Sequence, residues 1–209
     1  MKAYMLATND RYIYIYIYMN KLQNNITNPC TDKLSDIQYL EHMIPHHQVA
    51  IDMSHLVQPH VESVTILNLS RDIIRKQSYE IFEMKGMKRY NGDVVSNNMW
   101  RKENPMTSLD LYNPNLSKSV CNPLFFKPND HSKMMEGMVL NQKKYLEHMI
   151  PHHQVAIDMS RRLLLHTNNS YLLEFCRKLI IEQQGEIFYM ENLLNKHNYV
   201  YKSELLQDN

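Results

Sequence analysis

Methionine and histidine side chains recur together along this chain, and both can bind soft metal ions. The 209 residues include 15 Met and 11 His. The segment 39–54 contains Met43, His46 and His47, with Met53 further along. On a helix, where successive residues advance by about 100°, the first three share one face and Met53 lies at its edge. A thioether beside two imidazoles favours copper, Cu(I) in particular, over the hard ions Mg²⁺ and Ca²⁺.

The segment 39–54 recurs without a change at positions 145–160, an offset of 106 residues. Flanking positions differ freely, so duplication explains the shared layout, and the unchanged block indicates either a constraint or local gene conversion. A lone histidine is more often structural than a ligand, but a tandem pair repeated beside methionine favours metal binding. The second copy supplies a second set of candidate metal ligands, namely Met149, His152, His153 and Met159.

A further pair of polar residues follows each block. Gln77 and Glu80 share one face of the helix predicted there, and the offset relates them to Gln183 and Glu186. These side chains could be metal ligands, groups that orient the imidazoles, or hydrogen-bonding partners between helices, and the sequence leaves all three open. Met84 and its equivalent lie on the same faces, where a methionine is more often core filler than a ligand.

Other metals fit the pattern less well. A di-iron carboxylate bundle needs Glu-x-x-His pairs, but Ile44 follows three residues after Glu41, and Glu83 follows three after Glu80. Zinc could bind through the histidines, although thioether sulfur adds little for it. We therefore expect a copper ion, with Cu(I) favoured and Cu(II) or zinc as alternatives.

The second copy has an additional cluster that the first copy lacks. On a continuous helix His131, Met134, Met135 and Met138 would fall on one face. The cluster is either a further Cu(I) site or a loading site at the end of the bundle.

Each copy has the pattern of a helical hairpin. In the first, Ser35 and Gln38 form a capping-box signature for a helix over 36–57, and apolar spacing predicts a partner over 62–88. In the second, Asp130 could cap a helix that runs to about Leu165, with a break or bend near Gly137. Asn168 or Asn169 could cap its partner, ending near His197.

A proline precedes the paired histidines in each copy, at Pro45 and Pro151. Inside a helix it would remove one hydrogen bond and produce a kink that could aim the imidazoles. The alternative is that each helix begins at its proline, where the residue is harmless. We favour the kink, because Ser35 caps well upstream.

Neither hairpin can bury its apolar faces alone, which predicts an all-α, ferritin-like four-helix bundle with approximate two-fold symmetry. The alternative is that each hairpin pairs with another chain in a homodimer. The predicted order is an N-terminal tail (1–31), hairpin repeat 1 (32–92), an irregular linker (93–129), hairpin repeat 2 (130–199) and a C-terminal tail (200–209), with both repeats in one domain. Leu124, Phe125 and Phe126 suggest that part of the linker packs down.

Composition excludes several classes of protein. The formal net charge of +1 argues against binding nucleic acid or an anionic membrane by bulk charge, and 4 Gly make a glycine-rich phosphate loop improbable. Cys30, Cys121 and Cys176 form no Cys-x-x-Cys pair, which argues against a thiolate zinc site. The apolar run 12–19 is too short to span a bilayer and is either a tail or a degenerate signal or anchor, so the compartment stays open.

The repeated motifs resemble a known family. Met-Ile-Pro-His-His-Gln-x-Ala-Ile-x-Met, followed by Gln-x-x-Glu-Ile-x-x-Met, occurs at 43–53 with 77–84 and again at 149–159 with 183–190. It is similar to the bacterial copper-binding family known as domain of unknown function 305, in two tandem copies. The resemblance implies a ferritin-like bundle and a copper-tolerance protein, usually exported. Asp130-His-Ser-Lys-Met-Met also looks like the His/Met-rich leader of some relatives.

We therefore expect a copper-binding protein that sequesters the metal, confers tolerance or passes the metal on, without enzymatic turnover. No nucleophile–base pair or substrate pocket is recognisable in the sequence. The alternative is a non-metal helical protein-interaction module, in which the histidines are structural or sense pH.

Overall fold

The computed structural model describes residues 34–91, 122–165 and 167–205. The N-terminal Tyr-Ile run, Cys30, Trp100 and Cys121 lie outside these ranges. Every regular element within them is helical, which confirms the predicted all-α class. The α-helices are α2 (Asp36–Val57), α3 (Val64–Asn91), α4 (Pro128–Met135), α5 (Gln142–Leu164) and α6 (Ser170–Leu205), and the 3-10 turns are η1 (Gln58–His60) and η5 (Pro123–Phe126).

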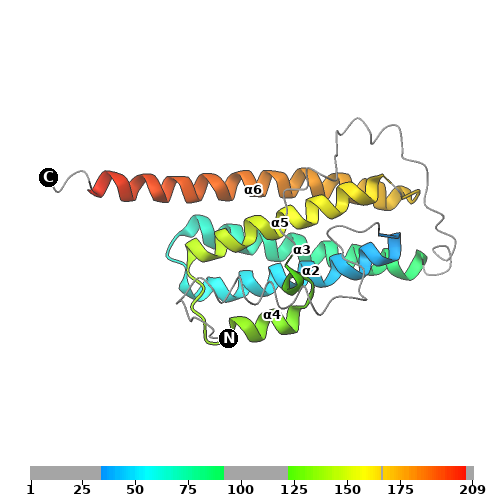
Figure 1. Cartoon of the computed structure of the whole chain (residues 1–209), viewed down its shortest axis with the longest axis horizontal. Helices are drawn as coiled ribbons and strands as arrows, with labels where there is room; N and C mark the ends of the chain where they lie inside the picture. The colour runs from blue at the N-terminus through cyan, green and yellow to red at the C-terminus, as the bar shows by residue number, and fades with distance from the viewer. Residues whose placement is uncertain (1–33, 92–121, 166, 206–209) are drawn as a thin grey trace, which may run out of the picture.

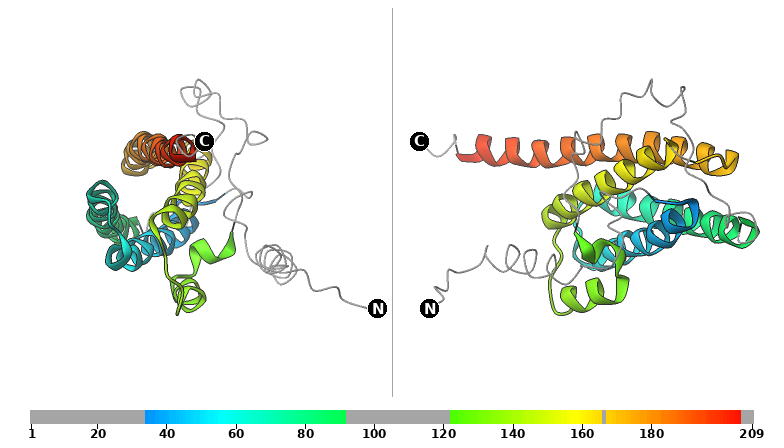
Figure 2. Two further views of the ribbon diagram at one scale, coloured as in Figure 1. Left: turned by 90° about the vertical axis from the view of Figure 1, so that its left-hand side faces the viewer. Right: turned by 45° about the vertical axis from the view of Figure 1, so that its right-hand side comes forward.

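The four long helices form two antiparallel hairpins that meet through α2 and α5. Helix α2 packs along α3, α5 packs along α6, and α2 contacts α5. Figure 1 shows the four long helices side by side, and the end-on view in Figure 2 shows α5 beside α2, and α6 on the same side of the molecule as α3. The short α4 and η5 lie against α2. The prediction of two hairpins packed together within one chain is confirmed.

Local capping fixes where the helices begin. The Ser35 hydroxyl accepts from the Gln38 backbone N–H at 3.3 Å, and the Gln38 side-chain oxygen accepts from the Ser35 N–H at 3.0 Å. This reciprocal capping box places the start of α2 where the sequence predicts it. Asn169 caps α6 by accepting from the Tyr171 N–H at 3.0 Å. Helix α6 runs to Leu205, beyond the predicted end near His197.

The start of the second hairpin differs from the prediction. Asp130 does not cap a long helix, because Pro128 already occupies the first turn of α4 and Lys127 is the N-cap residue. The predicted break is confirmed: α4 ends at Met135, and Gly137 has a φ of 75°, a left-handed conformation that favours glycine. Asn141 then caps α5, its side chain accepting from the Lys144 N–H at 2.9 Å.

Pro45 and Pro151 lie inside α2 and α5 respectively, so neither helix begins at its proline. The kink expected at these positions stays a prediction. The described part of the linker is partly ordered, as its apolar residues indicate: Leu124 and Phe125 are buried, and Phe126 packs against the core. The domain boundaries as such stay a prediction.

Both hairpins contribute to each of two buried apolar clusters. The first contains Met43 and Met84 together with Met159. The second contains their equivalents at the offset of 106, which are Met149, Met190 and Met53. The approximate two-fold relation predicted from the repeat is therefore visible in the core.

Two reciprocal hydrogen bonds follow the same relation. The Tyr39 hydroxyl and the Ser160 hydroxyl lie 2.7 Å apart, and those of Tyr145 and Ser54 lie 2.7 Å apart as well. Each buried tyrosine thus finds its partner on the other hairpin, which fixes the register of α2 against α5.

No helix in the described ranges has the length and apolar character needed to cross a bilayer.

Candidate metal centre

The paired histidines of the two copies meet where α2 and α5 cross. His46, His47, His152 and His153 are all fully buried. The rings of His46 and His152 stack, with centroids 3.6 Å apart and an interplanar angle of 27°. Within each pair the rings lie 6.1 and 6.2 Å apart, both at 56°. The structure therefore brings the four predicted imidazoles together at the interface between the hairpins.

In each pair the second histidine, His47 or His153, is hydrogen-bonded to one glutamate. His47 Nε2 lies 2.9 Å from Glu80 Oε2, and His153 Nε2 lies 2.8 Å from Glu186 Oε2. A neutral imidazole that donates from Nε2 keeps its lone pair on Nδ1, so each carboxylate selects the tautomer whose Nδ1 can bind a metal. Of the three roles left open by the sequence, the structure supports the one in which Glu80 and Glu186 orient imidazoles.

Five ring nitrogens of these histidines have no protein partner among the described residues. Within the described residues, Nδ1 of all four histidines is buried without a hydrogen bond, and so is Nε2 of His46. His152 Nε2 donates to the backbone oxygen of His46 at 3.0 Å. Each buried unsatisfied polar atom costs about 1–3 kcal/mol. These nitrogens are therefore available to a ligand or to a water molecule that enters this region.

The two glutamines are also buried near this region and unsatisfied. Neither the amide nitrogen nor the amide oxygen of Gln77 has a hydrogen-bonding partner, and the same holds for the Gln183 oxygen, within the described part of the chain. Both side chains are nearly inaccessible to solvent. They could hydrogen-bond a ligand or a water molecule that fills the centre.

Burial also controls the charge of the site. Desolvation lowers the pKa of His46 well below its ordinary value, with help from the neighbouring His47. Desolvation, together with the proximity of His46, does the same to the pKa of His152. Both rings are thus neutral at pH 7 and keep the lone pairs that a metal needs. Burial alone would raise the pKa of Glu186, but His153 and Lys76 outweigh it and lower that pKa to about 2.

The methionines are grouped differently from the prediction. Met43, Met53, Met149 and Met159 are all fully buried, but Met43 and Met53 belong to different apolar clusters. Ten residues of helix separate them by about 15 Å, so sharing a face does not bring them together. Each cluster instead combines thioethers of both copies, and it includes Met84 or Met190, which the sequence favours as core residues.

The additional cluster of the second copy is divided. His131 and Met135 are buried and Met134 is half-buried, but Met138 lies beyond the end of α4 and is 40% exposed. The expectation that all four share one helix face is wrong, because the helix stops at Met135.

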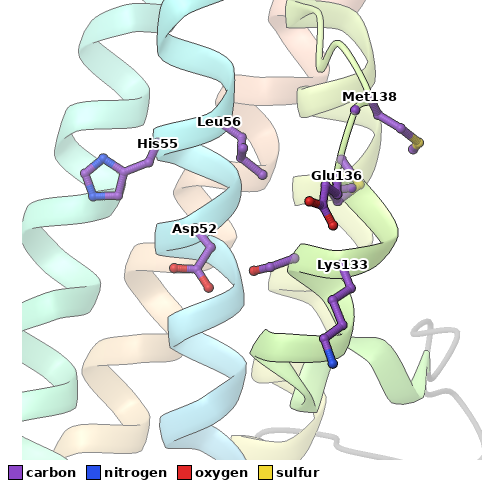
Figure 3. Close-up of a pocket in the computed structure, with 9 residues that line it drawn as sticks. Asp52, His55, Leu56, Lys133, Glu136 and Met138 are labelled. Atoms are coloured by element: carbon purple, nitrogen blue, oxygen red, sulfur yellow. The ribbon is translucent and has the colours of Figure 1, made fainter.

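Figure 3 shows a pocket between α2 and α4 that includes part of this cluster. It is lined by Asp52, His55, Met135 and Met138 among others. In this view the His55 ring and the Met138 side chain point away from each other. The donors of this pocket do not converge on one point.

Nitrogen and oxygen ligands alone do not make a complete metal site. Across the described ranges, no three His, Cys, Asp or Glu side chains are close enough to hold an ion together. A metal at the centre therefore needs a ligand of another kind, and the methionine thioethers on α2 and α5 are the candidates.

Several residues near the centre were not predicted. His42 lies one turn before His46, donates from Nδ1 to the Gln38 backbone oxygen at 2.7 Å, and packs edge-on to Phe126. The i, i+4 spacing within the repeated block was the available signal. Phe125 contacts the rings of both His46 and His152. No sequence signal beyond its apolar character pointed to that contact.

The sequence also gives no sign of the contact that Lys76 makes. Its basic neighbours on α3, Arg71 and Arg75, are exposed. Lys76 reaches across to α6 and pairs with Glu186 at 2.7 Å, and its side chain is 35% exposed.

Comparison with known proteins places this geometry in context. A family model described as Domain of unknown function (DUF305) matches residues 36–194 as a single span that includes both copies. CopM, solved in a Cu(II)-bound form, superposes with a TM-score of 0.57 at 25% identity, covering 79% of this chain and 99% of CopM. A DUF305 fragment from Deinococcus radiodurans gives 0.52 at 21% identity, covering 78% of this chain and 96% of the fragment.

One curated relative also matches over a shorter length. An uncharacterised protein of Acanthamoeba polyphaga mimivirus is 37% identical over 57 residues. The match covers 27% of this chain and only 38% of that relative.

Proposed function

Because this chain belongs to the DUF305 family, we propose that it binds copper at the interface between its two hairpins. The observation that carries the proposal is that four buried imidazoles lie next to one another along the crossing of α2 and α5, each with an Nδ1 atom that has no protein partner among the described residues. The neighbouring thioethers supply the soft ligands that favour Cu(I) over Cu(II) or zinc. CopM, which has been solved with Cu(II) and with Cu(I), supports copper as the metal.

The protein groups have distinct parts in this proposal. Glu80 and Glu186 fix the tautomer and orientation of His47 and His153. Burial, with the neighbouring histidines, lowers the pKa of His46 and of His152 and keeps both rings neutral. In this proposal the chain binds copper without catalysing a reaction. It therefore serves sequestration, tolerance or transfer of the metal and is not an enzyme.

The proposal also includes three further expectations that follow from the family resemblance. The chain is a tandem duplication, its bundle is ferritin-like, and its partners are metal ions rather than nucleic acid. The identical blocks at 39–54 and 145–160 and the reciprocal Tyr–Ser hydrogen bonds support the duplication.

Titration with Cu(I) against a chromophoric chelator tests the proposal. We expect the wild-type chain to compete for the metal, and a variant with His46, His47, His152 and His153 all changed to alanine to lose that competition. His60→Ala is the matched control, because this histidine is exposed and outside the repeated block. Equal competition by the wild type and the fourfold variant would rule out the site.

A second candidate function is a helical interaction module, which could include a homodimer. Its support is a set of large apolar side chains that are strongly exposed on α3 and α6: Phe82 at 73%, Ile181 at 73% and Phe188 at 68%. If this were the only function, added copper would leave thermal stability unchanged, because only a ligand that binds the folded state raises it.

A further inference from the structure

The two His–Glu pairs are equivalent in sequence but differ in their third partner. In the second copy, Glu186 accepts from His153 with one oxygen and from the Lys76 ammonium with the other, at 2.7 Å. The offset of 106 relates Lys76 to Glu182. The His153–Glu186 pair on the second hairpin is therefore accompanied by a lysine of α3, whereas the corresponding position beside the His47–Glu80 pair is the carboxylate Glu182 of α6.

The two residues that differ, Lys76 and Glu182, both line a groove between α3 and α6. Its lining residues are Arg75, Lys76, Tyr79, Glu80, Lys178 and Glu182. Thus Glu80, which holds His47, shares the groove with the acidic Glu182.

The other two cations of the groove contact groups other than Glu186. Arg75 pairs with Asp72 at 3.4 Å, and its side chain is 71% exposed. Lys178 is exposed and lies 5.8 Å from the centre of the Tyr79 ring. Among the described residues of the groove, Lys76 alone makes an ion pair with a carboxylate that orients a repeated histidine.

We propose that Lys76 makes the two halves of the centre unequal, so that the half containing His47 and Glu80 binds copper more tightly than the half containing His153 and Glu186. This inference rests on the proposed function. Three methionines of each cluster are equivalent at the offset of 106, and the second cluster also contains Met135. The difference that acts through the carboxylates is charge: Lys76 already compensates Glu186 and repels a second cation nearby.

The size of the effect follows from Coulomb's law. Two unit charges several ångströms apart in a partly buried site interact strongly enough to change an affinity about tenfold or more. Glu186 is only 12% exposed, so water screens this interaction incompletely. We therefore expect two classes of Cu(I) affinity that differ by about tenfold or more, the tighter on His47.

Stepwise Cu(I) titration of the full chain with competing chelators would measure the two affinities. Silver(I), a diamagnetic soft cation, would report which histidine is occupied first through the ¹⁵N signals of the imidazoles. We expect Lys76→Gln to tighten the weaker class and to bring the two affinities within about threefold. Arg75→Gln is the matched control, since it removes a cation from the same groove without touching Glu186, and should leave the gap unchanged.

Lys76→Arg provides a second variant that keeps the charge, and it should keep the gap even if Lys76→Gln folds poorly. Equal affinities in the wild type, first occupation of His153, or closure of the gap by Lys76→Arg would overturn the inference while leaving copper binding intact. A gap that Lys76→Gln does not change would also overturn it. Failure of the wild type to compete for copper at all would instead overturn the proposed function.

Discussion

The imidazole rings of His46 and His152 stack 3.6 Å apart at the crossing of α2 and α5, although 106 residues separate them in the chain. They are equivalent positions of the two copies, so the two-fold relation passes close to their contact. Each ring is fully buried and presents an unpartnered Nδ1. Buried ring nitrogens without a protein partner are thus found on both sides of the contact between α2 and α5.

The carboxylates that are hydrogen-bonded to His47 and His153 should matter for affinity. Glu80→Gln and Glu186→Gln remove the charged acceptor that fixes the ring, and we expect each to weaken copper binding by about 10- to 100-fold. Chelator competition would measure the loss. Glu174→Gln, at an exposed position on α6, should have no effect. Unchanged affinity in both test variants would contradict an orienting role for the carboxylates.

Methionines that bind metal can be distinguished from core methionines by a swap that conserves volume. Met43→Leu should cost less than about 1.5 kcal/mol of unfolding free energy, because the two side chains are similar in size. It should nevertheless weaken Cu(I) binding, since the thioether is lost. Ile44→Leu, at a half-buried position on α2, is the control, because it changes an apolar side chain without removing sulfur. Equal copper affinity in all three proteins would show that Met43 is core filler.

The stability of the metal-free protein should fall in mild acid. Burial lowers the pKa of His131 to about 4 and lowers those of His46 and His152 well below 6.5. Below pH 6.5 the unfolded chain takes up protons at these positions and the folded chain does not, so stability is full above pH 6.5 and declines as the pH falls toward 4.

His131 alone should account for a loss on the order of 2 kcal/mol over that window. Urea unfolding at a series of pH values would measure it, and His131→Gln should flatten part of the slope. Unfolding free energies that stay constant from pH 7 to pH 4.5 would contradict the buried, neutral state of these rings.

The reciprocal Tyr–Ser hydrogen bonds should couple the hairpins. Tyr39→Phe leaves the Ser160 hydroxyl without this partner and should cost about 1 kcal/mol, and Tyr145→Phe should cost a similar amount through Ser54. Adding Ser160→Ala to Tyr39→Phe should cost less than the sum of the single changes. Strict additivity in this double-mutant cycle would mean that the two hydroxyls do not interact.

Much of the fold could be predicted because its signals are local. Ser35 and Gln38 mark the start of α2, and Asn169 marks the start of α6. The repeat itself identified the two hairpins and the paired histidines. These features depend on residues a few positions apart, where capping and periodicity operate.

The predictions that failed depend on contacts between distant residues. Helical periodicity gives the face on which Met53 lies but not its partner, so its grouping with Met149 of the other copy could not be seen. Lys76 looks like any surface lysine until α6 brings Glu186 beside it. The start of α4 was also missed, because Pro128 in the first turn makes Lys127 and not Asp130 the N-cap residue.

X-ray absorption at the copper edge of the Cu(I)-loaded protein tests the central claim most directly. The account predicts a ligand shell with both imidazole nitrogen and thioether sulfur, in which the nitrogen contribution falls when His46 and His152 are changed to alanine. A shell without imidazole nitrogen, or one that is identical in that double variant, would contradict a copper centre at the crossing of the two hairpins.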